Sequence, residues 1–405
     1  MDITMISGGV TAAKGFRAAG IHCGIRKSRT KRDLALIVSE KRAAAASVYT
    51  TNLVKGASIA VTRDHIADGY AQAIVCNSGN ANTCNADGPV VAEKMCAVTG
   101  QALGIPKEDV IVASTGVIGQ RLDITPIENG MSALVSALGD SCEEAAEAIM
   151  TTDTKMKSVA VEFSVGGVTC RMGGIAKGSG MIHPNLATML VFITTDCAIS
   201  AEMLRKALSA DVKNTFNMVS VDGDTSTNDM ISVLANGMAE NPMIDGEGEA
   251  FDTFMRALNT VTVHLCRCIA ADGEGATKLL ECRVTGAKNE AAAKTAAKSV
   301  ICSSLTKAAM FGADANWGRV LCAIGYSGAD VDPSRADVKF VSRAGEISVC
   351  ENGAGVVFSE ELAKTILSED EIDILVAFRD GDASSTAWGC DLTYEYVRIN
   401  GDYRT

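Results

Sequence analysis

Short apolar runs of strand length alternate with longer segments of helical period along nearly the whole chain. The runs cover 34–38, 71–76, 110–115, 189–195 and 319–325, and the helical segments cover 89–103, 125–138, 201–215, 249–264 and 289–309. Apolar residues that recur every three or four positions indicate helices, and short apolar runs bounded by turn residues indicate strands. This alternation predicts a fold in which strands and helices are mixed throughout.

Further strand-like stretches lie close together near the end of the chain, at 336–341, 346–350 and 390–399. No helical segment separates each pair, whereas parallel neighbours need a crossover connection. Part of the sheet structure is therefore expected to be antiparallel. We expect an α+β, mixed αβ class in which helices are layered on a mixed sheet or on two stacked sheets.

The composition excludes several classes of protein. With 405 residues, 47% hydrophobic and 21% charged, the chain can bury a core of ordinary size, in one large domain or two. The net charge of −12 opposes nucleic-acid binding. The basic run at 26–32 is predicted to be a solvated loop. No membrane span is expected, because the longest charge-free stretch, 178–195, contains glycines, a histidine and a proline.

The fourteen cysteines are spread thinly along a long chain without a signal-peptide core at its start. We therefore expect a reducing, cytoplasmic compartment and free thiols, most of them buried. The chain has no CxxC pair, and its four histidines lack the spacing of metal ligands. The prediction is that there is no metal site and no cofactor.

Most standard catalytic motifs are absent from the sequence. It contains no GxxxxGK[ST], no GxGxxG after a strand and no GxSxG elbow. The acidic loop 222–229 resembles a calcium loop, but Val233 stands where the bidentate Glu of an EF-hand belongs. We expect this loop to be a turn rich in capping side chains.

One unusual stretch runs from Ala176 to Asp196, where a glycine-rich approach leads through a proline to Thr188 and an apolar strand. One interpretation is an ordinary loop that enters a buried strand. The other is that Thr188 is a latent nucleophile, released by cleavage after Ala187. Its new α-amine, with an ordinary pKa of about 7.7–8.0, would then serve as the base that activates its hydroxyl.

Several ordered blocks of the sequence resemble the ornithine acetyltransferase family, also called glutamate N-acetyltransferases or arginine biosynthesis bifunctional proteins. They are VTAAKGFRAAGIHCGIR at 10–26, CNSGNAN at 76–82, ASTGVIG at 113–119, MTTDT at 150–154, KGSGMIHPNLATML at 177–190, DGDTSTND at 222–229, DGEGATK at 272–278, ANWGRV at 315–320 and the terminal YVRINGDYRT. The departures are small: Ala13 and Gly401 stand where the family usually has Pro and Ala.

The resemblance implies a precursor that cuts itself before Thr188, giving an alpha chain of 1–187 and a beta chain of 188–405. Such chains pair into a heterotetramer, two of each. It also implies an α-β-β-α sandwich similar in outline to N-terminal nucleophile hydrolases. The implied reaction is transfer of acetyl from N-acetylornithine to glutamate through an acyl-threonine, with ping-pong kinetics. No cofactor, nucleic acid or membrane is implied.

The resemblance also assigns roles to particular residues. The oxyanion hole would use the hydroxyl of Thr115 and the N–H of Gly116, and the substrate would be bound by Lys177, Glu274, Asn400, Thr405, Thr188 and a threonine of the MTTDT block, Thr152 or Thr154, with Thr152 preferred. From the residues alone, ordinary structural roles are open for several of these: a strand exit at Thr115, a solvated lysine, an exposed turn around Glu274 and a helix cap at Thr152 or Thr154.

Two other functions remain open at this stage. The first is an aminopeptidase or amidase with the same cleaved nucleophile, in which water accepts the acyl group. The second is a non-enzymatic acidic binding protein in which Thr188 stays an internal strand residue. The resemblance leaves a second acetyl donor open, since some relatives also take acetyl from acetyl-CoA while others only recycle it.

Overall fold

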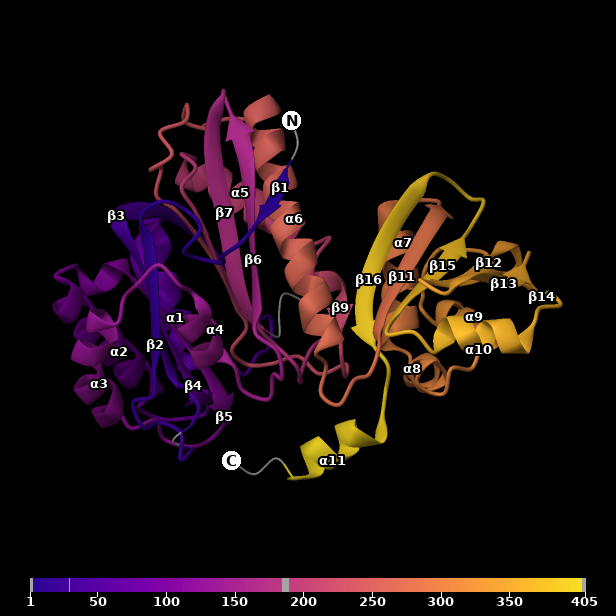
Figure 1. Ribbon diagram of the computed structural model, residues 1–405, viewed down its shortest axis with the longest axis horizontal. Helices are drawn as coiled ribbons and strands as arrows, with labels where there is room; N and C mark the ends of the chain where they lie inside the picture. Colours follow the sequence, from indigo (N-terminus) through magenta and orange to yellow (C-terminus); the bar gives the residue numbers. More distant parts are fainter. Residues whose placement is uncertain (1–2, 29, 184–188, 403–405) are drawn as a thin grey trace.

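The strands of the molecule form two mixed sheets covered by helices. The computed structural model describes residues 3–28, 30–183 and 189–402, and within these ranges one sheet has nine strands and the other seven. Figure 1 shows the two sheets toward opposite ends of the long axis, with α6 between them. The expected mixed αβ class with two sheets and covering helices is confirmed.

The first sheet has the strand order β1-β6-β7-β8-β10-β3-β4-β5, with β2 paired to β3. Its strands are β1 (Thr4–Ile6), β2 (Phe16–Ile21), β3 (Leu34–Tyr49), β4 (Tyr70–Asn80), β5 (Val110–Val117), β6 (Lys157–Val165), β7 (Val168–Lys177), β8 (Leu190–Thr195) and β10 (Met230–Ala235). The pairs β4–β5 and β8–β10 are parallel, and the others are antiparallel. Strands β8 and β10 thus lie between β7 and β3, which precede them in the chain.

The second sheet has the order β14-β13-β12-β15-β11-β16-β9. Its strands are β9 (Val219–Ser220), β11 (Leu279–Ala287), β12 (Asp337–Ser342), β13 (Gly345–Glu351), β14 (Ala354–Gly355), β15 (Glu371–Ala377) and β16 (Ala383–Cys390). The antiparallel pairs β12–β13 and β12–β15 confirm the expected antiparallel part.

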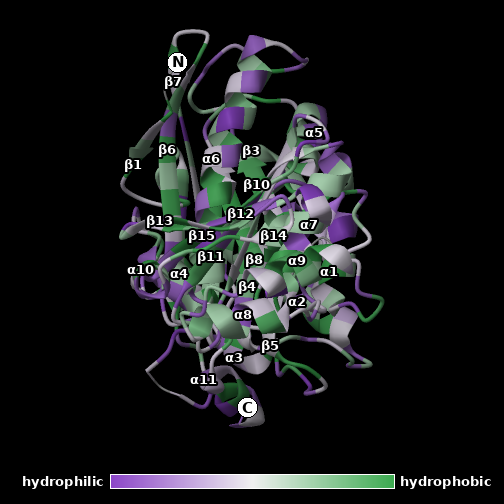
Figure 2. Cartoon of the chain, turned by 90° about the vertical axis from the view of Figure 1, so that its right-hand side faces the viewer, coloured by the Kyte–Doolittle hydropathy of each residue, from purple (hydrophilic) through white to green (hydrophobic). Residues whose placement is uncertain are grey.

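The helices cover both sheets and connect them. They are α1 (Ala57–His65), α2 (Gly88–Leu103), α3 (Thr125–Ser136), α4 (Glu143–Ile149), α5 (Ala201–Asp211), α6 (Glu249–Ala271), α7 (Glu290–Cys302), α8 (Ser304–Phe311), α9 (Trp317–Gly325), α10 (Glu360–Leu367) and α11 (Tyr394–Asp402). Helix α6 packs against β6 and β7 of the first sheet and against β11 and β16 of the second. In Figure 2, α6 carries alternating green and purple bands, as expected for a helix with one buried face.

Most of the predicted elements are confirmed, including the strands around 34–38, 71–76, 110–115 and 189–195. The long helical segment 289–309 is divided into α7 and α8 at Ser303, whose side chain accepts a hydrogen bond from the N–H of Thr306 at 3.2 Å. This cap begins a second helix, because it satisfies one of the N–H groups that a helix start leaves unpaired.

The prediction of a strand at 319–325 is wrong, because this run lies in α9. The side chain of Asn316 caps the helix by accepting from the N–H of Arg319. The buried residues Val320, Ala323 and Ile324 have the spacing of one helix face. An apolar run of seven residues does not by itself distinguish a strand from a buried helical segment.

The prediction of a strand at 390–399 is also wrong. Strand β16 ends at Cys390, and the exposed helix α11 begins at Tyr394. The hydroxyl of Thr393 accepts from the N–H of Glu395, and Glu395 pairs with Arg398 one turn later. These local contacts favour the helix over the alternating strand that the sequence YEYVRI resembles.

The cysteines and the hydropathy of the helices agree with the composition. Nine of the fourteen cysteines are buried and all fourteen are free, which confirms the predicted thiol state. Within the part of the chain that the structure describes, no helix is both long enough and apolar enough to cross a membrane.

Candidate active site

A pocket of about 230 Å³ gathers most of the residues that the sequence singled out. It is lined by residues from β5, β7, the start of β8, the loop before β10, the turn after α6, and α11. Six expected residues line it: Thr115, Gly116, Thr152, Lys177, Glu274 and Asn400. They come from five separate stretches of sequence, so the fold brings together residues that no single local motif connects.

The remaining expected residues lie elsewhere or outside the described ranges. Ala187, Thr188 and Thr405 are outside the described residues, although Met189 and Leu190, which follow Thr188, line the pocket. Thr154 is not in the lining. Its N–H donates to Asp272 at 3.0 Å and its hydroxyl bonds to the same carboxylate, which favours Thr152 as the threonine available to a ligand.

Thr115 and Gly116 lie where β5 leaves the sheet beside β4. The register between the two strands shifts here, so that Asn80 pairs with both Thr115 and Val117. Gly116 has φ +131°, and a Cβ there would collide with the main chain of Gly79 and Asn80. Only glycine fits this bulge. Within the described part of the chain, the Thr115 hydroxyl makes no hydrogen bond, so it is available to a ligand.

Lys177 is the last residue of β7 and is only 8% exposed. Among the described residues, its ammonium has neither a hydrogen bond nor an ion pair, although buried lysines are nearly always paired. Burial tends to raise the pKa of the nearby Asp153 carboxyl. The charges of Lys177 and Lys157 overcome this effect and hold that pKa well below its ordinary value. Lys177 is therefore a buried cation facing a pocket, suited to bind a carboxylate.

Glu274 supplies the opposite charge. It is buried, it lines the pocket, and its Oε2 accepts from the side-chain amide of Asn400 at 2.7 Å. Gly180 leaves room for it, because a Cβ at Gly180 would overlap the Glu274 carboxylate. Helix α11, which carries Asn400, closely approaches Gly275: a Cβ there would lie 2.6 Å from that of Glu395.

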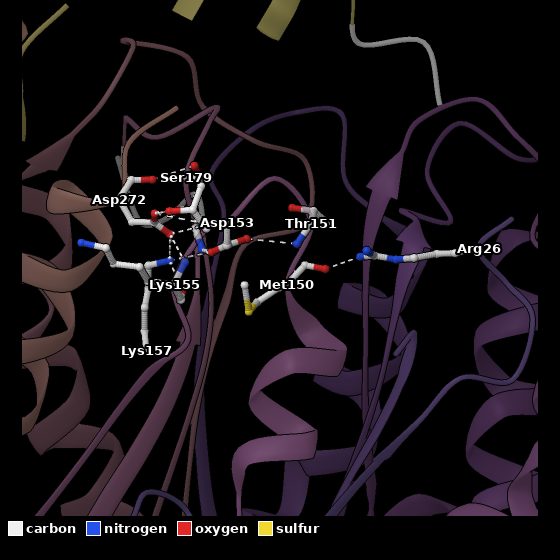
Figure 3. A network of polar contacts seen from close by, with 10 residues as sticks. Arg26, Met150, Thr151, Asp153, Lys155, Lys157, Ser179 and Asp272 are labelled. Carbon is white, nitrogen blue, oxygen red and sulfur yellow. Dashed lines mark hydrogen bonds and ion pairs between the residues drawn. The ribbon is translucent and has the colours of Figure 1, made fainter. Parts of the chain in front are cut away.

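A buried ionic network supports both charged walls of the pocket (Figure 3). The ammonium of Lys157 lies 2.8 Å from Asp153 and 2.6 Å from Asp272. Asp153 also accepts from the N–H of Gly178 at 2.7 Å, directly after Lys177. The main-chain carbonyl of Asp272 accepts from Ser179 at 2.7 Å, two residues before Glu274. The network thus fixes the main chain next to both charged residues.

The acidic loop 222–229 holds the floor of the pocket, largely through the capping contacts that the sequence predicts. Asp222 accepts from the main-chain N–H groups of Met181 and Ile182 at 2.6 and 2.9 Å. The amide of Asn228 donates to Ala81 and Ser114 at 2.6 and 2.9 Å, directly before Thr115. Inside the loop, Asp222 and Ser226 accept from the N–H groups of Asp224 and Asn228, both at 3.2 Å, which confirms the predicted turn with capping side chains.

Three residues of this loop also line the pocket, although no sequence motif indicates it: Ser226, Asn228 and Asp229. Asp229 is fully buried, and burial raises the pKa of its carboxyl well above the ordinary value. The sequence does contain one signal for Asp229. It directly precedes the apolar run 230–235, so a charged residue stands at the start of a buried strand.

A second cavity, of about 610 Å³, shares Gly116, Thr151 and Thr152 with the pocket. Its charged lining consists of Arg26, Lys27 and Lys31, all cationic. The main-chain N–H groups of Cys23, Gly24 and Arg26 donate to the buried carboxylate of Asp33, which holds this loop in place. The predicted solvated loop is confirmed, since the described residues of the run are irregular and Lys27 and Lys31 are exposed, and three of its cations also line this cavity.

The pocket brings a buried lysine and a buried carboxylate together beside the Thr115 hydroxyl and the positive-φ Gly116, an arrangement typical of the active site of an enzyme. A family model described as the ArgJ family matches residues 17–405. Residues up to 16 include only the start of the first sheet, so the match covers nearly the whole fold.

Known proteins agree with this match. The arginine biosynthesis bifunctional protein ArgJ of Caldanaerobacter subterraneus is 50% identical over 405 residues, covering 99% of this chain and 100% of the relative. The protein of the same name from Symbiobacterium thermophilum is 50% identical and covers 99% of both. A crystal structure of ArgJ from Bacillus halodurans, 47% identical with a TM-score of 0.51, covers 53% of this chain and 100% of its own.

The chain belongs to the ArgJ family. This confirms the family expected from the sequence blocks, and with it the enzyme class, an acyltransferase of arginine biosynthesis. The comparisons do not favour the aminopeptidase or the non-enzymatic binding protein.

Proposed function

We propose that this enzyme transfers the acetyl group of N-acetylornithine to glutamate through an acetyl ester on Thr188. The observation that carries the proposal is that Lys177 and Glu274, two buried residues of opposite charge, line the same small pocket. Lys177 would bind the α-carboxylate of either amino acid, and Glu274 with Asn400 would bind the cationic end of ornithine. Thr152 and Thr405 would complete substrate binding.

The proposed chemistry uses Thr188 as the nucleophile and the Thr115 hydroxyl as a hydrogen-bond donor. Oγ of Thr188 would attack the acetyl carbonyl, the C–N bond would break and ornithine would leave. The amine of glutamate would then attack the ester and release Thr188. Thr115, through its hydroxyl, and Gly116, through its N–H, would stabilise the oxyanion of both tetrahedral intermediates; each such donor contributes about 10²–10³ in rate.

Cleavage between Ala187 and Thr188 is the step that prepares the nucleophile, dividing the chain into 1–187 and 188–405. The crystal chain of Bacillus halodurans ArgJ supports this cleavage. That chain is matched over its whole length but covers only 53% of this one, whereas the Caldanaerobacter relative covers 99%. A chain from 188 to 405 would be a similar share. The two parts would remain joined by the first sheet, where β8 and β10 lie between β7 and β3. Two of each would assemble into a heterotetramer.

The test is substitution of Thr188. Denaturing electrophoresis of the active enzyme should show two fragments, with the larger beginning at Thr188. The variant Thr188→Ala should give one band of 42.1 kDa and no acetyl transfer, while Thr188→Ser should retain some cleavage and some transfer. Two fragments in the Ala variant would indicate an outside protease and would contradict self-cleavage. Release of free acetate in place of acetylglutamate would indicate the amidase.

A cationic cavity beside the pocket supports a second acetyl donor. The cationic cavity of Arg26, Lys27 and Lys31 adjoins the pocket, which favours acetyl-CoA, with its phosphates, as a second acetyl donor. The double variant Lys27→Ala/Lys31→Ala should then raise KM for acetyl-CoA; an unchanged KM would exclude this role.

The state of the cysteines supports a compartment. Fourteen free thiols favour a reducing compartment, the cytoplasm.

The C-terminal tail offers an independent check of the pocket. Asn400 is bound to Glu274, and Thr405 is only five residues further along the chain. If Thr405 contacts the substrate, extending the chain beyond it should raise KM for N-acetylornithine. A C-terminal extension that leaves turnover and KM unchanged would contradict the role of Thr405.

A further inference from the structure

Asp229 is the buried carboxyl of the pocket that has no role in the scheme above. It stands immediately before β10, it is 2% exposed, and it lines the pocket. Within the described part of the chain, its Oδ2 is buried without a hydrogen-bond partner. Since an unsatisfied buried carboxyl oxygen is costly, its presence beside a ligand pocket calls for a partner that arrives with the substrate.

The surroundings of Asp229 favour a proton on its carboxyl. Burial is the main effect and raises the pKa, and it is only partly opposed by Ser226, the charge of Lys177, Thr50 and the main-chain N–H of Met189. These groups come from the loop before β10, the end of β7, the end of β3 and the start of β8. Among them, Lys177 is the charged one.

The proposed reaction needs one proton that the nucleophile does not supply. When Thr188 attacks N-acetylornithine, its hydroxyl proton goes to the nitrogen and the C–N bond breaks. The free amine then takes up a second proton and becomes an ammonium. Glutamate arrives as an ammonium and must lose one proton before it can attack. Amines are mostly protonated at neutral pH.

We propose that Asp229 is the residue that gives this proton in the first half-reaction and takes it back in the second; the inference rests on the proposed acetyl transfer. The protonated Asp229 donates to the lone pair of the amine that C–N cleavage has released, and becomes a carboxylate. That carboxylate then accepts one proton from the ammonium of glutamate, whose amine attacks the ester carbonyl. The C–O bond breaks, and the second N–H proton returns to Oγ of Thr188. The enzyme ends as it began.

Two acetyl donors separate this role from a purely structural one. N-acetylornithine releases an amine that attacks the ester again unless it is protonated, whereas p-nitrophenyl acetate releases a phenolate that leaves without a proton. We expect Asp229→Asn to lower kcat/KM for N-acetylornithine relative to p-nitrophenyl acetate by at least about 100-fold, the usual size of general acid catalysis. Equal loss with both donors, or no change in the ratio, would overturn the proposal.

The second half-reaction gives a matching test. Hydroxylamine is largely unprotonated at neutral pH, so it can attack an acetyl-enzyme without losing a proton first. The acetyl-enzyme of Asp229→Asn, prepared with p-nitrophenyl acetate, should react normally with hydroxylamine and slowly with glutamate. If the rate with glutamate divided by the rate with hydroxylamine is the same in Asp229→Asn as in the unsubstituted enzyme, the proposed proton transfer is contradicted.

A matched control is available in Asp211 of α5. It is also buried, and burial raises the pKa of its carboxyl too, but it bonds to Asn259 and Thr215 and lies outside the pocket lining. Asp211→Asn should leave both ratios within about twofold of the unsubstituted enzyme, because it alters no proton transfer. A similar change in both Asn variants would show a nonspecific effect of removing a buried carboxyl and would overturn the proposal.

The unsubstituted enzyme provides a test that does not depend on the folding of any variant. The ratio of kcat/KM for N-acetylornithine to that for p-nitrophenyl acetate should fall as pH rises through the raised pKa of Asp229, since the donor must be protonated. A ratio independent of pH would overturn the inference. Failure of the enzyme to form an acetyl-enzyme with either donor would instead contradict the proposed function itself.

Discussion

The carboxylate of Glu274 occupies the space that a side chain at Gly180 would need. The two residues come from the glycine-rich loop after β7 and from the turn after α6, on either side of the proposed cleavage point. Asn400 holds the carboxylate on its other side at 2.7 Å. The position of this negative charge therefore depends on the absence of a single Cβ.

Gly180→Ala should displace the Glu274 carboxylate and weaken binding of the cationic end of N-acetylornithine. Hydrogen bonds to charged groups contribute about 1.5–3 kcal/mol, so KM should rise by about 10- to 100-fold. Steady-state kinetics would measure it. Gly246→Ala is the control, because nothing lies within 4 Å of a Cβ there. If KM is unaffected in Gly180→Ala, Glu274 does not bind this substrate.

Thr115→Val tests the oxyanion hole. The substitution keeps the shape of the side chain and removes the hydroxyl that makes no hydrogen bond within the described chain. We expect kcat to fall about 10²- to 10³-fold while KM changes little, because the donor acts on a charge that exists only in the transition state. Thr260→Val is the control, since its hydroxyl bonds to Arg256 within α6. An unchanged kcat in Thr115→Val would exclude this role.

Lys157→Met should destabilise the protein strongly. It removes the only cation that directly contacts both Asp153 and Asp272 among the described residues, and breaking a buried ion pair costs about 3–5 kcal/mol. Thermal unfolding would measure the change. Lys288→Met, which breaks the exposed pair with Asp330, should cost less than about 1 kcal/mol. Equal shifts in the two variants would show that the buried network adds no particular stability.

The same network predicts a loss of stability in acid. The pKa of Asp153 is held well below its ordinary value of 3.8 by Lys177 and Lys157, despite its burial. The folded state thus favours the carboxylate, so this contribution is complete above pH 3.8 and is lost as pH falls below it. Unfolding midpoints measured between pH 6 and about pH 3 should fall. The Asp153→Asn variant should be less stable than the unsubstituted protein at pH 6, and its unfolding midpoint should fall less as the pH is lowered.

Local patterns explain which parts of the fold and site the sequence predicts. Strand β8 was predicted because its apolar run is continuous, and α2 because its period is clear. Helices α9 and α11 were missed because their type depends on a cap at Asn316 and on short-range contacts after Thr393, which compete with a strand-like composition. Length and alternation do not record such contacts.

The chemistry of the site shows the same limit. Lys177 and Glu274 were named through family resemblance, because a lysine in a loop and a glutamate in a turn are ordinary in isolation. Asp229 was missed because its importance comes from burial and from an unsatisfied oxygen, and both depend on packing between segments far apart in the sequence. No spacing rule connects it to Lys177.

The interleaved order of the first sheet determines what each half of the chain would be by itself. Strands β8 and β10 lie between β7 and β3, so a separated N-terminal half would expose two bare strand edges in the middle of its sheet, and the other half would expose two more. Unpaired edges are templates for aggregation. The two halves would therefore have to be synthesised together to stay soluble, and a cell that made one in excess would accumulate it as insoluble protein.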